Sequence, residues 1–203
     1  MQNEGFNWRS VTLILIAINV AVFLADPLVQ QYHGLLAFTP AYASEMPWTF
    51  VTSVFMHGGF AHIMFNMFGL FMFGTFLESR IGWQKFIMIY LVAGVVGNVG
   101  YMVTSEDALI PGVGASGAIY GVMGVLAVIA YRAQIYVMLL PIPVRMYIGV
   151  IIYAAVEIFF FNRDNIASGA HLGGLVIGVL YGLYLRHLIK KIERKHRVSY
   201  VWE

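Results

Sequence analysis

Two residues that could perform nucleophilic chemistry stand in segments of this chain that are otherwise apolar. Ser116 follows Gly114 and Ala115 and precedes Gly117 at the start of one apolar run, and His171 lies near the start of another. Polar or ionisable residues inside a membrane are costly and are read as functional by default. A serine with a histidine base is the smallest set for nucleophilic catalysis, so the pair predicts a serine hydrolase site inside a membrane.

The chemistry assigns a role to each group. Ser116 would attack a carbonyl, and neutral His171 would accept its proton and later protonate the leaving amine. The oxyanion needs donors, which the N–H groups at the start of a helix can supply. The side chains of His62 and Asn66 could add two more. Because Glu78 lies at the other end of its helix, we expect a Ser-His dyad without a third acid.

The composition places the chain in a membrane. It has 203 residues, of which 60% are hydrophobic and 11% are charged, with a mean hydropathy of +0.78. Soluble domains carry about 25% charged residues. The net charge of +2 does not suggest a nucleic-acid partner, and the absence of cysteine excludes disulfides and thiolate chemistry. We expect one polytopic membrane domain over residues 1–203.

Six apolar runs are long enough to cross a bilayer as helices, so we expect an all-α fold with six transmembrane spans. The first span is expected to end at Asp26-Pro27, and the fifth to begin after Pro143. The expected spans are approximately 10–26, 57–78, 83–103, 115–131, 144–161 and 167–189.

Positive charge predicts the orientation of these spans. In a six-span arrangement eleven of the twelve Lys and Arg residues fall on one side, and only Arg163 falls on the other. Both termini are therefore expected to be cytoplasmic. The basic segment 190–197 is expected to be an inside anchor near anionic lipid. Segment 27–56 has no Lys or Arg but several aromatic residues, so we expect it to lie in the outer interface.

The helical rise predicts that the polar residues lie at similar depths. At about 1.5 Å per residue, Ser116 lies about 24 Å from the inner end of its helix near Arg132, and therefore about 6 Å below the outer boundary of a hydrocarbon core about 30 Å thick. By the same rise, His171 lies about 9 Å from the outer end of its helix near Asn165. Small residues at a spacing of three or four allow two helices to approach closely. Both helices carry them, at Gly117, Gly121 and Gly124 on the first and Gly174, Gly178 and Gly182 on the second.

Each of these residues also has a purely structural interpretation. A serine in a membrane helix often bonds its own backbone, which would account for Ser116. His62 and Asn66 could be interhelical hydrogen-bond partners. Tyr120 could be core packing, and Glu78 could cap an inner loop.

Together these residues resemble the rhomboid family of intramembrane serine proteases, over about Trp48 to Gly178. The resemblance implies a nucleophile Ser116, a base His171, and an oxyanion hole of His62, Asn66 and the Ser116 N–H. The fragments that carry it are His57-Gly-Gly-Phe-Ala-His62-Ile-Met-Phe-Asn66, Glu78, Gly114-Ala115-Ser116-Gly117 with Tyr120, and Ala170-His171-x-x-Gly174-x-x-x-Gly178.

The same resemblance implies that Tyr120 stacks on His171, and that Gly114, Gly117, His57 and Glu78 support the site. It implies no cofactor and no metal. Substrates would be transmembrane proteins, cut near the outer end of a helix after a small residue, and entering near the fifth span. The six-span form is that of the bacterial inner membrane, with the site opening outward. Many members have Trp-Arg where this chain has Trp48-Thr49, which leaves the anchoring of that outer loop open.

Several other classes remain as alternatives. One is a rhomboid-like protein that binds membrane clients without cleaving them, and another is a channel or small transporter. A metalloprotease is disfavoured because there is no H-E-x-x-H motif. On one helix His57 and His62 would also point about 140° apart. A soluble-type hydrolase elbow needs glycine where this chain has Ala118.

Overall fold

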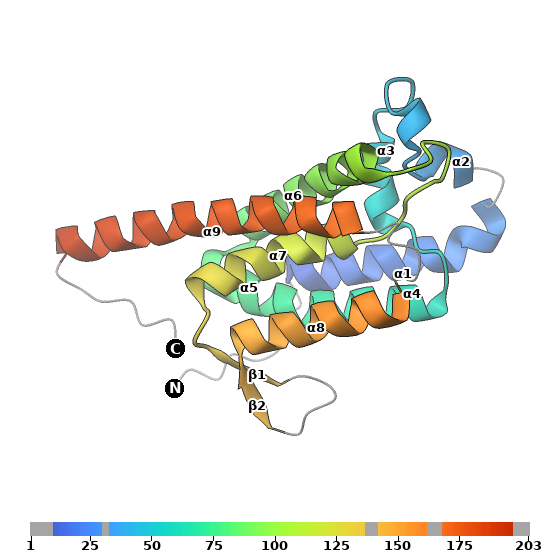
Figure 1. Ribbon diagram of the computed structural model, residues 1–203. Coiled ribbons are helices and arrows are strands. Elements are labelled where there is room, and N and C mark those ends of the chain that lie inside the picture. The colour runs from blue at the N-terminus through green and yellow to red at the C-terminus, as the bar shows by residue number, and fades with distance from the viewer. Residues whose placement is uncertain (1–9, 30–32, 137–141, 162–167, 197–203) are drawn as a thin grey trace.

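The apolar runs of the sequence form helices that lie side by side with roughly aligned axes (Figure 1). The computed structural model describes residues 10–29, 33–136, 142–161 and 168–196. The main helices are α1 (Val11–Val29), α4 (Phe60–Gly69), α5 (Thr75–Ile81), α6 (Trp83–Thr104), α7 (Ser116–Ile129), α8 (Met146–Phe161) and α9 (Ser168–His196). A π-helical turn, η4 (Leu70–Gly74), joins α4 to α5 without a break.

Shorter elements lie between these helices. The segment between α1 and α4, called the outer segment after the position expected for it, contains α2 (His33–Leu36), η2 (Pro40–Tyr42), α3 (Thr49–Thr52) and η3 (Ser53–Phe55). Between α7 and α8 the chain forms a two-stranded antiparallel hairpin of β1 (Gln134–Tyr136) and β2 (Pro143–Arg145). The hairpin corrects the all-α expectation, because the described part of the chain is mostly helical but not wholly so.

Three of the helical stretches are long and apolar enough to cross a membrane, namely Phe60–Ile81, Trp83–Thr104 and Ser168–Ile192. Three shorter helices are also apolar, over Val11–Ala25, Ser116–Ile129 and Met146–Val156. The polytopic helical fold expected from the sequence is confirmed at this level.

The ends of several helices differ from the expected spans. α1 continues past Asp26-Pro27 to Val29, with Pro27 in its last turn. α8 begins at Met146 because the residues just before it pair with β1. α9 continues to His196, well beyond residue 189, through a run rich in Lys, Glu and Arg residues, which favour helix.

The central helix of the bundle is α7. Twelve of its fourteen residues are buried, as expected for a helix that is apolar on every side. Its glycines lie directly against α9. A Cβ atom on Gly174 would overlap the carbonyl oxygen of Gly117, and one on Gly178 would overlap that of Gly121. Only small residues permit this approach, which brings the starts of α7 and α9 together.

At the opposite end of the bundle, Glu78 of α5 caps the start of α1. Its carboxylate accepts hydrogen bonds from the backbone N–H of Val11 at 2.7 Å and of Thr12 at 2.9 Å. The hydroxyls of Ser10 and Thr12 donate to it as well, each at 2.7 Å. Because a helix start has unpaired N–H groups and a positive dipole end, a carboxylate stabilises it. Glu78 therefore caps a helix rather than the inner loop that we expected.

Candidate active site

The side chains of Ser116 and His171 meet at the packed starts of α7 and α9. His171 Nε2 lies 2.9 Å from Ser116 Oγ. Both residues are buried, with 7% of Ser116 and 6% of His171 exposed. When the imidazole carries its proton on Nδ1, the hydroxyl of Ser116 donates to Nε2. The arrangement is that of a nucleophile beside a general base.

Tyr120 fixes the plane of the imidazole. Its ring stacks on the ring of His171 with the centroids 4.3 Å apart and the planes 6° from parallel. Tyr120 lies one helical turn after Ser116, so residues four apart present the two side chains on the same face of α7. The stacked ring holds the imidazole in line with the hydroxyl.

The loop before Ser116 depends on a glycine for both its conformation and its space. Gly114 has a φ of +128°, a value that residues with a Cβ atom rarely adopt. A Cβ at this position would lie 2.8 Å from Cε1 and Nε2 of His62. The imidazole of His62 therefore lies directly against the backbone that leads to Ser116.

Asn66 and His62 lie one turn apart on α4. The amide nitrogen of Asn66 donates to the carbonyl oxygen of His62 at 3.0 Å. Asn66 is 2% exposed, and its side-chain oxygen has no hydrogen-bond partner among the residues that the structure describes. The structure thus places His62 beside the Ser116 loop, while the amide of Asn66 bonds its own helix.

His57 lies in the loop before α4, not on the helix. Its ring contacts that of His62, with centroids 5.2 Å apart and an interplanar angle of 67°. The expectation that the two rings point apart is wrong, because it assumed one helix for both. Burial, and then the electrostatic influence of the neighbouring His62, lower the pKa of His57 to about 3. Within the described ranges, no three His, Asp or Glu residues gather to hold a metal ion.

The Ser116 loop is tied to the outer segment by residues that the sequence interpretation missed. The N–H of Gly114 donates to the carbonyl of Ser53 at 3.0 Å. Asn98 of α6 donates to Ser53 Oγ at 2.9 Å and to the carbonyl of Phe50 at 2.8 Å. Phe38 and Gly112 exchange backbone hydrogen bonds at 3.1 and 2.7 Å. The only sequence signal for Asn98 was a polar residue inside an apolar run.

The outer segment is braced without an arginine after Trp48. The indole of Trp48 donates to the carbonyl of Leu35 at 2.7 Å, and the hydroxyl of Thr52 donates to that of Leu36 at 2.7 Å. Thr49 itself bonds the carbonyl of Met46 at 2.7 Å. The contacts of Trp48 and Thr52 hold the two halves of the segment together.

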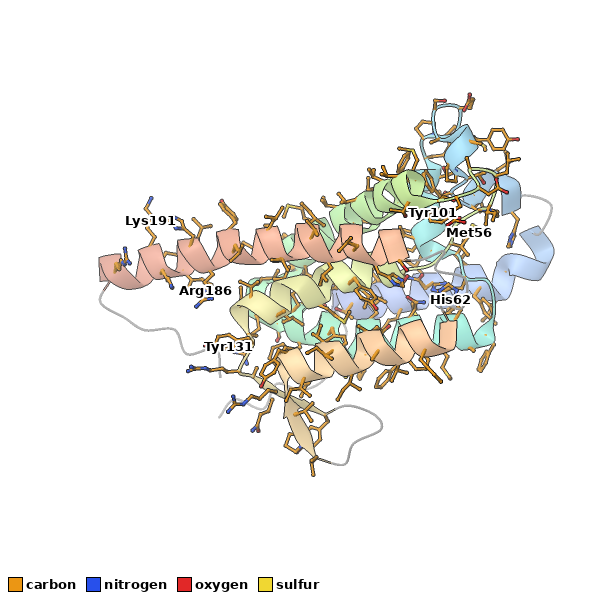
Figure 2. The ribbon with its side chains drawn as sticks, in the orientation of Figure 1. Met56, His62, Tyr101, Tyr131, Arg186 and Lys191 are labelled. Carbon is orange, nitrogen blue, oxygen red and sulfur yellow. The ribbon has the colours of Figure 1, made fainter. Side chains whose placement is uncertain are left out.

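A cavity of about 160 Å³ lies beside Ser116. Asn98, Tyr101, Val113, Gly117 and Ala170 contribute to its lining. Figure 2 shows His62 and Tyr101 at one end of the bundle and Arg186 and Lys191 at the other. The Ser-His pair therefore lies at the end of the bundle away from the basic end of α9.

A helical membrane protein with a buried Ser-His pair is the class that this fold and site define. The Rhomboid domain family model matches residues 44–188, so the chain belongs to the rhomboid family.

Several similar proteins align with most of the chain. The putative rhomboid protease YdcA of Bacillus subtilis is 33% identical over 150 residues, which cover 73% of this chain and 71% of the relative. The rhomboid protease GlpG of Haemophilus influenzae is 27% identical, over 90% of this chain and 94% of its own. The mitochondrial rhomboid protein 1 of Saccharomyces cerevisiae is 29% identical over 94% of this chain, but the match spans only 57% of that relative.

Proposed function

We propose that this protein is an intramembrane serine endopeptidase with Ser116 as nucleophile and His171 as general base. The observation that carries the proposal is the 2.9 Å contact between Ser116 Oγ and His171 Nε2. Membership of the rhomboid family, in which the similar proteins include named proteases, supports it.

The reaction proceeds in two halves. Ser116 Oγ attacks the scissile carbonyl while His171 Nε2 takes the hydroxyl proton. The tetrahedral intermediate collapses, the C–N bond breaks, and His171 gives the proton to the leaving amine. A water molecule then attacks the acyl-enzyme, with His171 again acting as base, and releases the carboxylic acid and free Ser116. The stacked ring of Tyr120 keeps the imidazole aligned throughout.

The oxyanion would be held by groups from two helices. As the first residue of α7, Ser116 offers an N–H that has no partner within the helix, at the positive end of the helix dipole. The imidazole of His62, beside Gly114, lies in position to add a donor. Asn66, one turn along α4, would add a second side-chain donor when its amide turns from the His62 carbonyl.

We propose transmembrane segments of other membrane proteins as substrates. The six apolar helices would all span the bilayer, with both termini cytoplasmic and the site opening outward. The clustering of Arg186 and Lys191 away from the site supports this orientation (Figure 2). The cavity of about 160 Å³ suits a small side chain before the scissile bond. The substrate would enter beside α8. At this place the hydroxyl of Tyr153 on α8 donates a hydrogen bond to the carbonyl of Phe65 on α4 at 3.2 Å.

The experiment is cleavage of a reporter with a transmembrane segment in proteoliposomes. Ser116→Ala and His171→Ala should each abolish cleavage, and a fluorophosphonate probe should label the protein only when Ser116 is present. His187→Ala is the matched control, because His187 is exposed on the same helix as His171 but in its basic half. Capture of the reporter without cleavage by the unaltered chain would favour a client-binding protein. Solute flux without any product would favour a channel.

A further inference from the structure

The hairpin between α7 and α8 has one buried face and one exposed face. Successive side chains of a strand point to opposite sides. Ile135 is buried in the helical core, and Val144 packs against that core. The other face carries the remaining side chains of the hairpin, and these are exposed to the surroundings of the bundle. The register pairs Gln134 with Arg145, Ile135 with Val144, and Tyr136 with Pro143.

The exposed face changes character along the hairpin. At its base, next to the helices, lie the charged side chains of Arg132 and Arg145, both exposed. At its far end Tyr136 is 70% exposed on this face, and Ile142, the residue just before β2, is 62% exposed. Tyr136 and Ile142 are thus two large apolar side chains that are exposed at the same end of the hairpin, as at a binding face.

The base of the hairpin is fixed rigidly to the bundle. The N–H of Met146, the first residue of α8, donates to the carbonyl of Ala133 at 2.7 Å. The side chain of Met146 is fully buried. The hairpin projects sideways from the start of α8, across the axes of the helices (Figure 1). Because the helices would cross the bilayer along their axes, the hairpin would lie at the level of one membrane surface.

The charges at this end of the bundle indicate which surface it meets. Tyr131, beside the hairpin, lies at the same end as Arg186 and Lys191 (Figure 2). The guanidinium of Arg132 lies over the ring of Tyr131, 5.2 Å from its centroid. Arginine with tyrosine is typical of the boundary between lipid headgroups and acyl chains. Anionic headgroups complement this basic end.

We propose that Tyr136 and Ile142, at the far end of the described strands β1 and β2, insert into the headgroup region of the anionic inner leaflet. Tyr136 and Ile142 would lie among the upper acyl segments, and Arg132 and Arg145 would contact lipid phosphates. Since β2 runs directly into α8, the inserted hairpin holds the inner end of α8 against the lipid surface. The inference rests on the membrane disposition proposed above and not on the catalytic roles of Ser116 and His171.

The absence of cysteine from the chain makes a clean test available. Tyr136→Cys and Ile142→Cys are made singly in the full chain, labelled with an environment-sensitive fluorophore and reconstituted in vesicles of phosphatidylcholine with phosphatidylglycerol. Quenching by lipids with a nitroxide near the headgroup is compared with quenching by aqueous iodide. Glu106→Cys, in an exposed loop at the other end of the bundle, is the water-exposed control, and Gln134→Cys is the control at the hairpin base.

We expect probes at Tyr136 and Ile142 to be quenched by the lipid nitroxide and protected from iodide, with the reverse at Glu106. Replacing Arg132 and Arg145 by Gln should lower the ratio of lipid-exposed to water-exposed probe by about fivefold for each arginine in vesicles that contain phosphatidylglycerol. The ratio should not change in vesicles without phosphatidylglycerol. Probes at Tyr136 and Ile142 that are as open to iodide as Glu106 would overturn the proposal. So would protection that requires a soluble protein extract. Repeating the measurement with Ser116→Ala separates this result from any failure of the protease proposal.

Discussion

The carbonyl of Ser53 accepts a hydrogen bond from the N–H of Gly114 at 3.0 Å, which joins the outer segment to the loop that carries Ser116. Asn98 reinforces the joint from α6 through Ser53 Oγ and the Phe50 carbonyl. The position of the nucleophile is therefore determined by three parts of the chain that are far apart in sequence.

Asn98→Ala removes both of these hydrogen bonds and leaves the Phe50 carbonyl and the Ser53 hydroxyl without that donor. We expect the free energy of unfolding to fall by about 1–3 kcal/mol. We also expect a lower kcat at matched folded amounts, because the Ser116 loop loses its brace. The measurement is reporter cleavage alongside thermal unfolding in detergent.

The control for Asn98 is Asn19→Ala. Asn19 is buried on α1 and its amide bonds the carbonyl of Leu15 on the same helix, so its loss should affect stability without a specific effect on kcat. Equal kcat losses in the two variants would show that Asn98 has no positioning role.

Gly114→Ala should nearly abolish cleavage. The φ of +128° is strained for alanine, at a cost of about 1–3 kcal/mol. The new Cβ would also displace the imidazole of His62. Fluorophosphonate labelling of Ser116 and reporter cleavage should both fall. Gly34→Ala is the control, since no atom lies within 4 Å of a Cβ there. Wild-type cleavage by Gly114→Ala would mean that this loop geometry is not needed.

Glu78→Gln should destabilise the protein by about 1–2 kcal/mol while leaving kcat unchanged at matched folded amounts. The amide replaces one of the two acceptor oxygens with a donor and removes the charge that favours the start of α1. Thermal unfolding measures the loss, with the exposed Glu106→Gln as control. A kcat that fell without any change in thermal unfolding would place Glu78 in the chemistry instead.

Sequence reasoning located the contact between Ser116 and His171 because helix rise and glycine spacing are local properties. It did not find the donors to Glu78, since they lie on α1, a different helix. The hairpin was missed because β1 and β2 have three residues each, which is too short for an alternating pattern. The pairing of the two strands also depends on the hydrogen bond from the N–H of Met146 to the carbonyl of Ala133, two residues that are not neighbours in sequence. His57 was misplaced because an apolar run does not show where its helix begins.

The two side chains assigned to the oxyanion should differ in effect. Asn66→Ala should slow cleavage without abolishing labelling of Ser116, because the Ser116 N–H and His62 remain. His62→Ala should do more damage, since its imidazole lies directly against Gly114. Loss of one oxyanion donor typically costs about 10²–10³ in kcat, and we expect less than this for Asn66. Reporter turnover of both single variants and the double variant at matched folded amounts measures the effects.

The double variant tests whether the two residues act as a unit. His62 and Asn66 lie one turn apart on the same face of α4 and would donate to the same oxyanion, so the losses should be coupled rather than additive. Strictly additive losses would mean independent roles. Wild-type turnover in both single variants, together with lower melting temperatures, would instead make His62 and Asn66 structural hydrogen-bonding residues of α4 and remove them from the oxyanion site.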